Sequence, residues 1–541
     1  SVNSSDVTTQ VAWTFRKAKK FFDVVTYTGN STNRTISHNL GSVPGMMLIK
    51  KTSGTGNWMV YHRGANGGTN PEQYYGKLND VDAFSTLASA WNNTAPTSSV
   101  FSLGDQIHVN ENGSTYVAYL FAHNNNDGEF GSAQDQDIIK CGYYNGNGTT
   151  DGSNKITLGF EPQFVFLKRS DGGAYYSQII DSMRGMVSGG NDQIIWGNVN
   201  SAENGTLNSV DATATGFSVN DSGNSNLNGS TWIYTAIRRG PLAVPDDATK
   251  VFSVLTGDGN GDSTTPQFAS GFPVDTALIR SATGTANNNL YSRLTANKYL
   301  STNSTAAEVT DATDFSFAAN TGWYLGSTTW TSWMWKRAPS YFDVSTYTGT
   351  GSARTVSHNL GAVPEMIWVK CRSHAESWVI YHKNMDGSAP EDYGSYLDDS
   401  VGRVDSANFW NDTAPTSSVF TVGTASKTNG SSQDYIAMLF ASVEGVSKLG
   451  GYTGNGSTQT INCGFAPRLI MIKKAINGNG GFMLFDTLRG IVAGNDPYLL
   501  LYTTDAQNFG ADTIDPHATG FTVNDGNTNA NTDGYIFYAI A

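Results

Sequence analysis

The chain has 541 residues, a formal net charge of −13 and a pI near 5.0. This balance argues against nucleic acid as a partner, because phosphate binding needs clustered Lys and Arg. Charged residues make up only 15%, against about 25% in an ordinary soluble domain. No run of 18 apolar residues occurs, so we expect no membrane insertion.

The first predicted element is a strand in residues 11–18, and a later segment parallels it. WTFRKA from Trp13 to Ala18 matches WMWKRA from Trp333 to Ala338, and each is followed by Phe-Asp-Val. The chain therefore opens on what resembles the closing strand of a preceding module. Two alternatives follow: the sequence is a fragment of a longer protein, or this strand is donated to a neighbouring sheet.

Five copies of one pattern then follow along the chain. Each opens on a segment that ends in Gly, such as Tyr27-Thr28-Gly29, and then has a Gly-x-Pro or Gly-x-x-Pro turn, an apolar strand, a strand that alternates, and an aromatic closing strand. The copies pair as one-two and four-five, with a weaker third copy between them. The turn prolines are Pro44, Pro162, Pro273, Pro364 and Pro467. The predicted boundaries are 1–20 for the closing strand or linker, then sandwiches at 21–131, 132–245, 246–339, 340–445 and 446–541.

Each copy is about 100 residues long, the size at which a β-sandwich closes its own core. Period-two segments and short apolar runs, punctuated by Asn-Gly and Asp-Gly, predict antiparallel strands joined by tight turns. We therefore predict an all-β chain, a tandem array of five antiparallel sandwiches of a lectin or jelly-roll type. Strung in line, they would span on the order of 170 Å. The one predicted helix lies at residues 82–91.

Two other residue types are assigned structural roles. Cys141, Cys371 and Cys463 occupy non-equivalent positions of the repeat, so we expect free or buried thiols and assembly in a reducing cytoplasm. The histidine pairs His38/His358 and His62/His382 have no partners at metal-ligand spacing, which favours hydrogen-bonding roles over catalysis.

An insertion peculiar to copies one and four is the strongest candidate for a binding site. Aromatic rings beside Asn suit stacking on sugar faces and hydrogen bonding to hydroxyls. The alternative is that the tryptophans only cap the core beneath a long loop. The predicted carbohydrate-binding residues are Tyr74, Tyr75, Trp91, Asn92, Tyr393, Tyr396, Trp410 and Asn411.

Copies two and five carry a different element, which predicts local ion pairs between Asp181 and Arg184 and between Asp486 and Arg489. The oxygen-rich loops at Asp221 and Asp525 make calcium the one cofactor that these loops could hold, although hairpins use the same residues. No nucleophile elbow, phosphate loop or zinc signature occurs, so we expect no enzyme and no other cofactor.

The segment WNDTAPTSSVFTVG from Trp410, which leads to DYIAMLFA from Asp434, resembles a repeat of virion appendage proteins of tailed phages, especially marine ones. The resemblance covers copies one, two, four and five closely and copy three loosely. It implies a tail-fibre or surface-fibre protein with lectin-like sandwiches. The chain would be made in the host cytoplasm and exposed on the virion. Its partners would be other virion proteins, copies of itself and a host surface glycan or protein.

Two other classes stay open at this point. A secreted bacterial adhesin or extracellular fibre subunit would have the same build, and neighbouring genes would distinguish it from a phage protein. A polysaccharide-degrading enzyme with binding repeats is the third, because carboxylates that pair in space are invisible in sequence.

Overall fold

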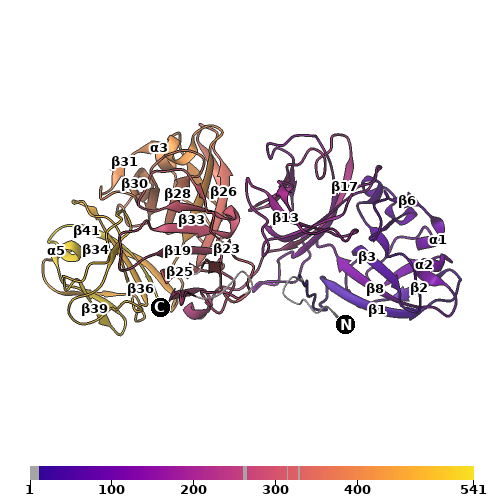
Figure 1. The fold of residues 1–541 in the computed structure, drawn as a ribbon, viewed down its shortest axis with the longest axis horizontal. Helices are drawn as coiled ribbons and strands as arrows, with labels where there is room; N and C mark the ends of the chain where they lie inside the picture. Colours follow the sequence, from indigo (N-terminus) through magenta and orange to yellow (C-terminus); the bar gives the residue numbers. More distant parts are fainter. Residues whose placement is uncertain (1–10, 260–264, 314, 327–328) are drawn as a thin grey trace. The chain divides into compact units, whose positions relative to one another are not determined.

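The protein is seen in a computed structural model that describes residues 11–259, 265–313, 315–326 and 329–541 (Figure 1). The chain divides into two compact units, Ser1–Gly240 and Pro241–Ala541. Within the described residues it is all-β, with five large antiparallel sheets, each faced by a small sheet of two or three strands. The prediction of an array of antiparallel sandwiches is confirmed.

The first unit holds two of the large sheets. In spatial order the first has β1 (Phe22–Thr28), β8 (Thr115–Ala122), β3 (Pro44–Lys51), β4 (Met59–His62), β5 (Tyr74–Lys77) and β6 (Ser85–Thr86). The second has β9 (Ile139–Asn145), β17 (Thr231–Arg238), β11 (Pro162–Arg169), β12 (Gln178–Asp181), β13 (Asp192–Trp196) and β14 (Asn204–Leu207). The small sheets pair β2 (Arg34–Ser37) with β7 (Val100–Leu103), and β10 (Lys155–Thr157) with β16 (Gly216–Val219) and β15 (Val210–Thr213).

The second unit holds the other three large sheets. The third sheet has β18 (Phe252–Thr256), β25 (Thr331–Trp335), β19 (Thr276–Arg280), β20 (Asn289–Ser292), β21 (Lys298–Ser301) and β22 (Val309–Thr310). The fourth has β26 (Phe342–Thr348), β33 (Asp434–Phe440), β28 (Met366–Cys371), β29 (Val379–His382), β30 (Tyr393–Tyr396) and β31 (Val404–Asp405). The fifth has β34 (Ser447–Thr453), β41 (Gly534–Ile540), β36 (Leu469–Ile476), β37 (Met483–Asp486) and β38 (Leu499–Leu500).

The small sheets of the second unit pair β23 (Phe315–Ser316) with β24 (Tyr324–Leu325), β27 (Arg354–Ser357) with β32 (Val419–Val422), and β35 (Gln459–Asn462) with β40 (Gly520–Val523) and β39 (Ile514–His517). Helices are short. In the described residues they are η2 (Ala65–Gly68), η3 (Pro71–Gln73), α1 (Ala88–Trp91), α2 (Ile107–Asn110), η4 (Ala248–Lys250), η5 (Arg293–Thr295), η6 (Pro390–Asp392), α3 (Ala407–Trp410), α4 (Ser426–Asn429) and α5 (Gly526–Asn529).

The predicted helix at 82–91 is wrong over most of its length. Only Ala88–Trp91 is helical, because Ser85 and Thr86 pair with β5 and Leu87 is extended. The i, i+3, i+4 spacing of apolar residues there reflects a strand end followed by one helical turn.

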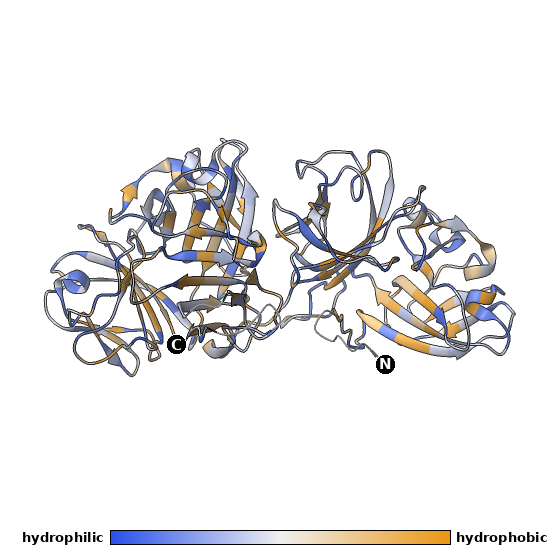
Figure 2. Cartoon of the chain, in the orientation of Figure 1, coloured by the Kyte–Doolittle hydropathy of each residue, from blue (hydrophilic) through white to orange (hydrophobic). Residues whose placement is uncertain are grey.

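All five large sheets share one connectivity, which explains the repeat in the sequence. In each, the first strand of the copy pairs with the last, and the last pairs with the strand that follows the proline turn, as β1, β8 and β3 do. Apolar residues run along these central strands (Figure 2). One face of each large sheet packs on its small sheet, as Val369 of β28 does with Phe420 of β32.

A buried asparagine fixes the opening loop of four copies. Asn110 donates from its amide to the carbonyls of Thr32 and Gly104, and its side-chain oxygen accepts the backbone N–H of Asn30. The same bonding pattern, with local variations, is made by Asn226, Asn429 and Asn529. A buried amide needs such partners, so in copy one this residue ties the loop after β1 to the end of β7.

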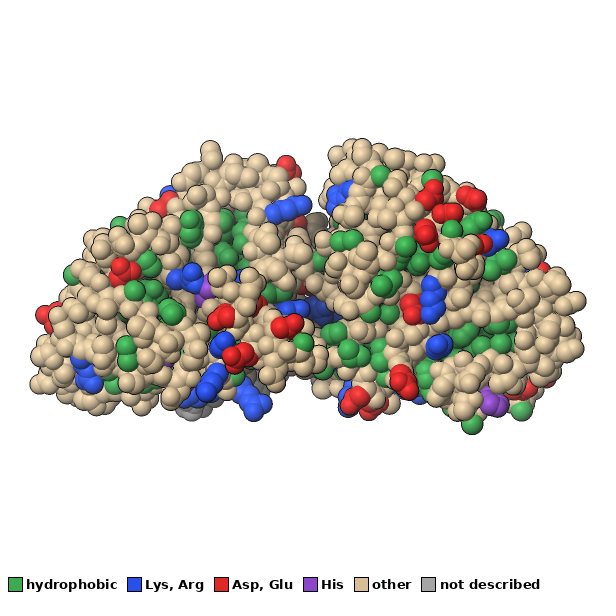
Figure 3. All heavy atoms as spheres, turned by 180° about the vertical axis from the view of Figure 1, so that it is seen from behind, with side chains coloured by type: hydrophobic (Ala, Val, Ile, Leu, Met, Phe, Trp, Pro, Cys, Tyr) green, Lys and Arg blue, Asp and Glu red, His purple; other side chains and the backbone are tan. Residues whose placement is uncertain are grey.

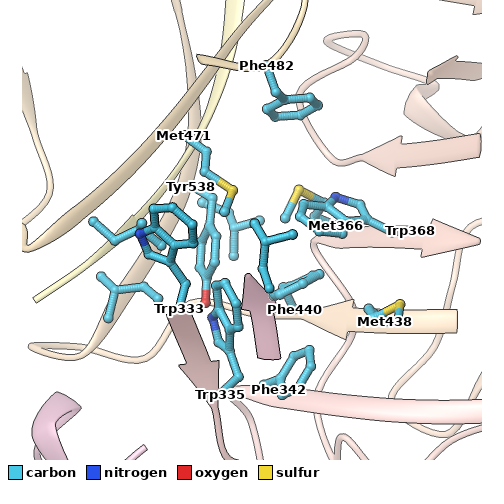
Figure 4. Close-up of a cluster of buried hydrophobic side chains, with 14 of the residues drawn as sticks. Trp333, Trp335, Phe342, Met366, Trp368, Met438, Phe440, Met471, Phe482 and Tyr538 are labelled. Atoms are coloured by element: carbon cyan, nitrogen blue, oxygen red, sulfur yellow. The ribbon is translucent and has the colours of Figure 1, made fainter. Parts of the chain in front are cut away.

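In the second unit, the other faces of the three large sheets meet in one common core. Figure 4 shows Trp333 and Trp335 of the third sheet beside Trp368 and Phe440 of the fourth and Tyr538 of the fifth. All five side chains are buried. Each large sheet therefore has two apolar faces, one for its own small sheet and one for its two neighbours.

Hydrogen bonds link every pair of these three sheets. Trp378 Nε1 donates to the carbonyl of Ser301, joining the fourth sheet to the third, at 3.0 Å. His382 joins the fourth sheet to the fifth through the carbonyl of Phe537. Arg280, which is fully buried, joins the third sheet to the carbonyl of Leu500 in the fifth. The expected row of beads in line is wrong for this unit, because its three sheets surround a shared interior.

His62 and His382 are interface residues, as their predicted hydrogen-bonding role requires. His62 Nδ1 accepts the backbone N–H of Gly64 at 3.0 Å, so its Nε2 carries the proton and donates to the carbonyl of Tyr234 at 3.0 Å. His382 makes the matching bonds to Asn384 and Phe537. Burial lowers the pKa of both histidines to about 3.

We expect His62 to make folding of the first unit sensitive to acid. Between pH 6.5 and about 3, an unfolded chain binds a proton on His62 while the folded chain does not. The free energy of unfolding should therefore fall by about 1.4 kcal/mol per pH unit below pH 6.5, with no contribution above it. Urea titrations of the parent and of His62→Gln from pH 7 to 4 measure the difference in slope. Equal slopes would contradict the assignment.

Candidate functional site

The loops peculiar to copies one and four form the predicted binding site, and the structure builds them alike. In copy one, η3 leads into β5, and α1 follows β6 and ends at Trp91. Trp91 Nε1 donates to the carbonyl of Tyr74 at 2.9 Å, and Trp410 Nε1 donates to the carbonyl of Tyr393 at 3.1 Å. The indole thus ties the helical turn to the strand beside it.

Neither tryptophan is available to stack on a sugar. Trp91 is 1% exposed and Trp410 is 2% exposed. Their rings lie edge-on to Tyr61 and Tyr381 in the cores of their sandwiches. The prediction that these two rings bind carbohydrate is wrong, because both indoles are buried in the core beneath the insertion.

The polar residues that follow the tryptophans are exposed. Asn92 and Asn411 have φ of 53° and 54°, and they end the two helical turns in the left-handed region, which Asn tolerates well. The predicted tyrosines are half-buried; they are Tyr74, Tyr75, Tyr393 and Tyr396. The Tyr393 ring also carries the Arg403 guanidinium, 4.3 Å from its centroid.

The two loops differ in charge. In copy four, Arg403 forms an ion pair with Asp386 at 2.9 Å. Partial desolvation and the charges of Asp412 and Glu391 raise the pKa of Asp392. The corresponding part of copy one has Gln73 and Asn93 in place of Asp392 and Asp412. The copy-four loop is therefore more acidic than its counterpart.

Both predicted ion pairs are present, and each has a third member that the sequence analysis missed. Arg489 Nε lies 2.7 Å from Asp486 Oδ2, and Trp333 Nε1 donates to the same oxygen at 3.0 Å. In the first unit Arg184, Asp181 and Trp13 repeat the arrangement with the same two distances. The missed signal was the match between WTFRKA and WMWKRA, which placed both tryptophans at one position of the repeat.

The calcium candidates act as loop acceptors. Asp221 Oδ1 accepts the backbone N–H groups of Gly223 and Asn224. Asp525 Oδ1 accepts those of Asn527 and Thr528 at the start of α5. Turn formation accounts for both carboxylates, and calcium binding there stays a prediction. Among the residues that the structure describes, no group of three or more His, Cys, Asp or Glu is placed to hold a metal ion.

The remaining sequence candidates are also accounted for. Cys141, Cys371 and Cys463 are free and buried, as predicted. His38 Nε2 lies 3.2 Å from the carbonyl of Thr97, and His358 repeats this contact with Thr416. Across the described ranges, no helix is both long and apolar enough to cross a bilayer.

The chain is thus an all-β protein of repeated sandwiches whose large sheets also pack on one another. It belongs to a family described as a domain of unknown function, DUF7483, which matches residues 3–241 and 247–541. The two matched segments fall on the two compact units. No match is found among curated proteins.

Proposed function

We propose that this protein is a structural and attachment protein of a phage particle, a tail fibre or surface fibre that presents sandwiches to the host surface. The observation that carries the proposal is that the distinctive buried residues of the repeat all have structural roles. The buried Asn, the interface His, the Asp-Arg pair and the indoles all serve the scaffold. Polar turns are exposed to solvent and are therefore available for binding.

The surface supports the same proposal. Figure 3 shows a face made mostly of uncharged polar side chains and backbone, with several hydrophobic patches and with charged side chains scattered over it. Such a surface resists indiscriminate ionic binding and offers many hydrogen-bonding groups. Several weak contacts along one chain add up by avidity. In this proposal the exposed Asn turns and half-buried tyrosines of copies one and four contact host glycans.

Asn92 and Asn411 provide a sharp test, because glycine keeps the left-handed turn and removes only the amide. We expect the double variant Asn92→Gly/Asn411→Gly to bind an array of bacterial surface polysaccharides at least about tenfold more weakly than the parent, since two sites are lost from a multivalent contact. The matched control is Asn126→Gly/Asn477→Gly, which changes two exposed, positive-φ asparagines elsewhere. Equal losses in both double variants, or none in either, would argue against this site.

A separate measurement tests whether the protein is located on phage particles. The chain should be a component of purified phage particles, and antibodies against it should label tail or surface fibres in electron micrographs. Its absence from particles, together with labelling of bacterial surfaces, would favour the adhesin. Release of reducing ends from a bound polysaccharide would instead favour the enzyme.

A further inference from the structure

The third sheet covers one side of the core in the second unit. It does so mainly through β25, whose Trp333 and Trp335 are buried against the other two sheets. β25 lies between β18 and β19 and is hydrogen-bonded to both. The cover is therefore a whole sheet, and β25 is the strand that anchors it.

Residues 11–15 of the first unit are the counterpart of this anchor strand, an unpaired segment that makes the same side-chain contacts. Trp13 and Trp333 are 320 residues apart. Each donates its indole N–H to the equivalent aspartate at 3.0 Å. Each also lies under an arginine, with Arg184 5.4 Å from the Trp13 centroid and Arg489 5.4 Å from the Trp333 centroid. Yet in the described part of the chain no strand pairs with Val11–Phe15.

The apolar face that a third sheet would cover is correspondingly more open in the first unit. Four of its side chains are half-buried where their equivalents in the second unit are buried. The pairs are Leu48 and Trp368, Tyr119 and Met438, Phe164 and Leu469, and Ile179 and Leu484. Strand registers establish these equivalences, since Phe164 pairs with Ile237 as Leu469 pairs with Ile540.

Three of these four side chains, Leu48, Phe164 and Ile179, line an apolar groove with a volume of about 150 Å³. Its walls come from both large sheets of the unit and from the anchor strand, through Phe15, Leu48, Phe121, Phe166 and Ile179. Phe121 and Phe166 correspond to Phe440 and Met471, which lie at the centre of the shared core in Figure 4. The groove is therefore the counterpart of that core with one side uncovered.

We propose that this groove is the seat of a third large β-sheet of the same repeat, carried by the same polypeptide ahead of Val11. Strands of that sheet would flank Val11–Phe15 as β18 and β19 flank β25. The anchor strand selects this occupant, because it already holds the position, the hydrogen bond and the arginine contact of β25. A second copy of the chain offers no free third sheet, since its own residues 252–335 are packed in the shared core.

The test supplies the missing sheet. A second copy of residues 247–330 is placed directly ahead of Val11 in the full chain. Because Trp13 is the equivalent of Trp333, Val11 is the equivalent of Thr331 and continues the inserted copy in register. Ile179→Cys reports on the groove in both proteins, and the buried native thiols give the background. In the extended chain we expect the maleimide reaction of this thiol to slow by about tenfold or more, the protection that burial under a folded sheet gives. Leu484→Cys, its equivalent in the second unit, calibrates the covered state.

Each outcome decides the proposal. Protection of the Ile179→Cys thiol in an extended chain that sediments as a monomer supports it. An unchanged reaction rate overturns it, and so does mild proteolysis that removes the inserted residues while residues 11–541 resist, because the sheet then has no seat. If the unextended chain is a dimer whose Ile179→Cys thiol is already protected, a second copy fills the groove and the proposal is wrong. The comparison does not depend on Leu484→Cys folding.

Discussion

Phe440→Ala is expected to lower the free energy of unfolding of the second unit by about 3–5 kcal/mol, the cost of removing a fully packed aromatic ring. Phe440 is 2% exposed and contacts the rings of Phe342, Trp368 and Tyr538. Because these partners come from two large sheets, the loss should not stay in the fourth sheet. Denaturant unfolding of the full chain measures the change.

Hydrogen exchange identifies the strands that Phe440→Ala destabilises. We expect amides of β19 in the third sheet and β36 in the fifth to exchange faster in Phe440→Ala, together with those of β33. Independent sandwiches would confine the change to the fourth sheet, which would contradict a shared core. Phe121→Ala is the matched variant, and it should cost less because the Phe121 ring lines the open groove.

Asp486→Asn is expected to destabilise the second unit by a similar amount, about 3–5 kcal/mol, because it leaves a buried guanidinium without its counter-charge. Asp486 is fully buried, and Arg489 and Trp333 both donate to it. Asparagine has the same shape, so the change removes charge without leaving a cavity. Denaturant unfolding, with exchange of the β37 amides, measures the loss.

Asp181→Asn is the control in the first unit. Arg184 keeps a second ion pair with Glu203, so its charge stays compensated when Asp181 is neutralised. We therefore expect a clearly smaller loss than for Asp486→Asn. Equal losses would show that the ion pair with Glu203 does not compensate Arg184 when Asp181 is neutralised.

Much of the fold could be predicted from the sequence because each copy repeats the same local signals. The proline turns, the alternating strands and the Asn-Gly turns specify one sandwich, and they recur five times. The Asp-Arg pairs were also predictable, since their members lie three positions apart in the sequence. These features are local, and local chemistry determines them.

The packing between sheets was not predictable in the same way. Residues such as Trp368 and Met471 lie in apolar runs, and such runs indicate burial on both faces without saying what covers the second face. Trp91 and Trp410 failed as predicted sugar platforms for a related reason. A tryptophan in a polar loop is compatible with stacking or with capping, and only the position of the core beneath it distinguishes the two.

The shared core of the second unit constrains how such a gene can grow. A lone extra repeat would bring one large sheet whose second apolar face has nothing to pack on, and an internal loss of one repeat would leave two such faces uncovered. Unequal recombination within a three-sheet unit should therefore be tolerated best when it adds or removes the complete set of three, a step of roughly 300 residues at about 100 residues per repeat.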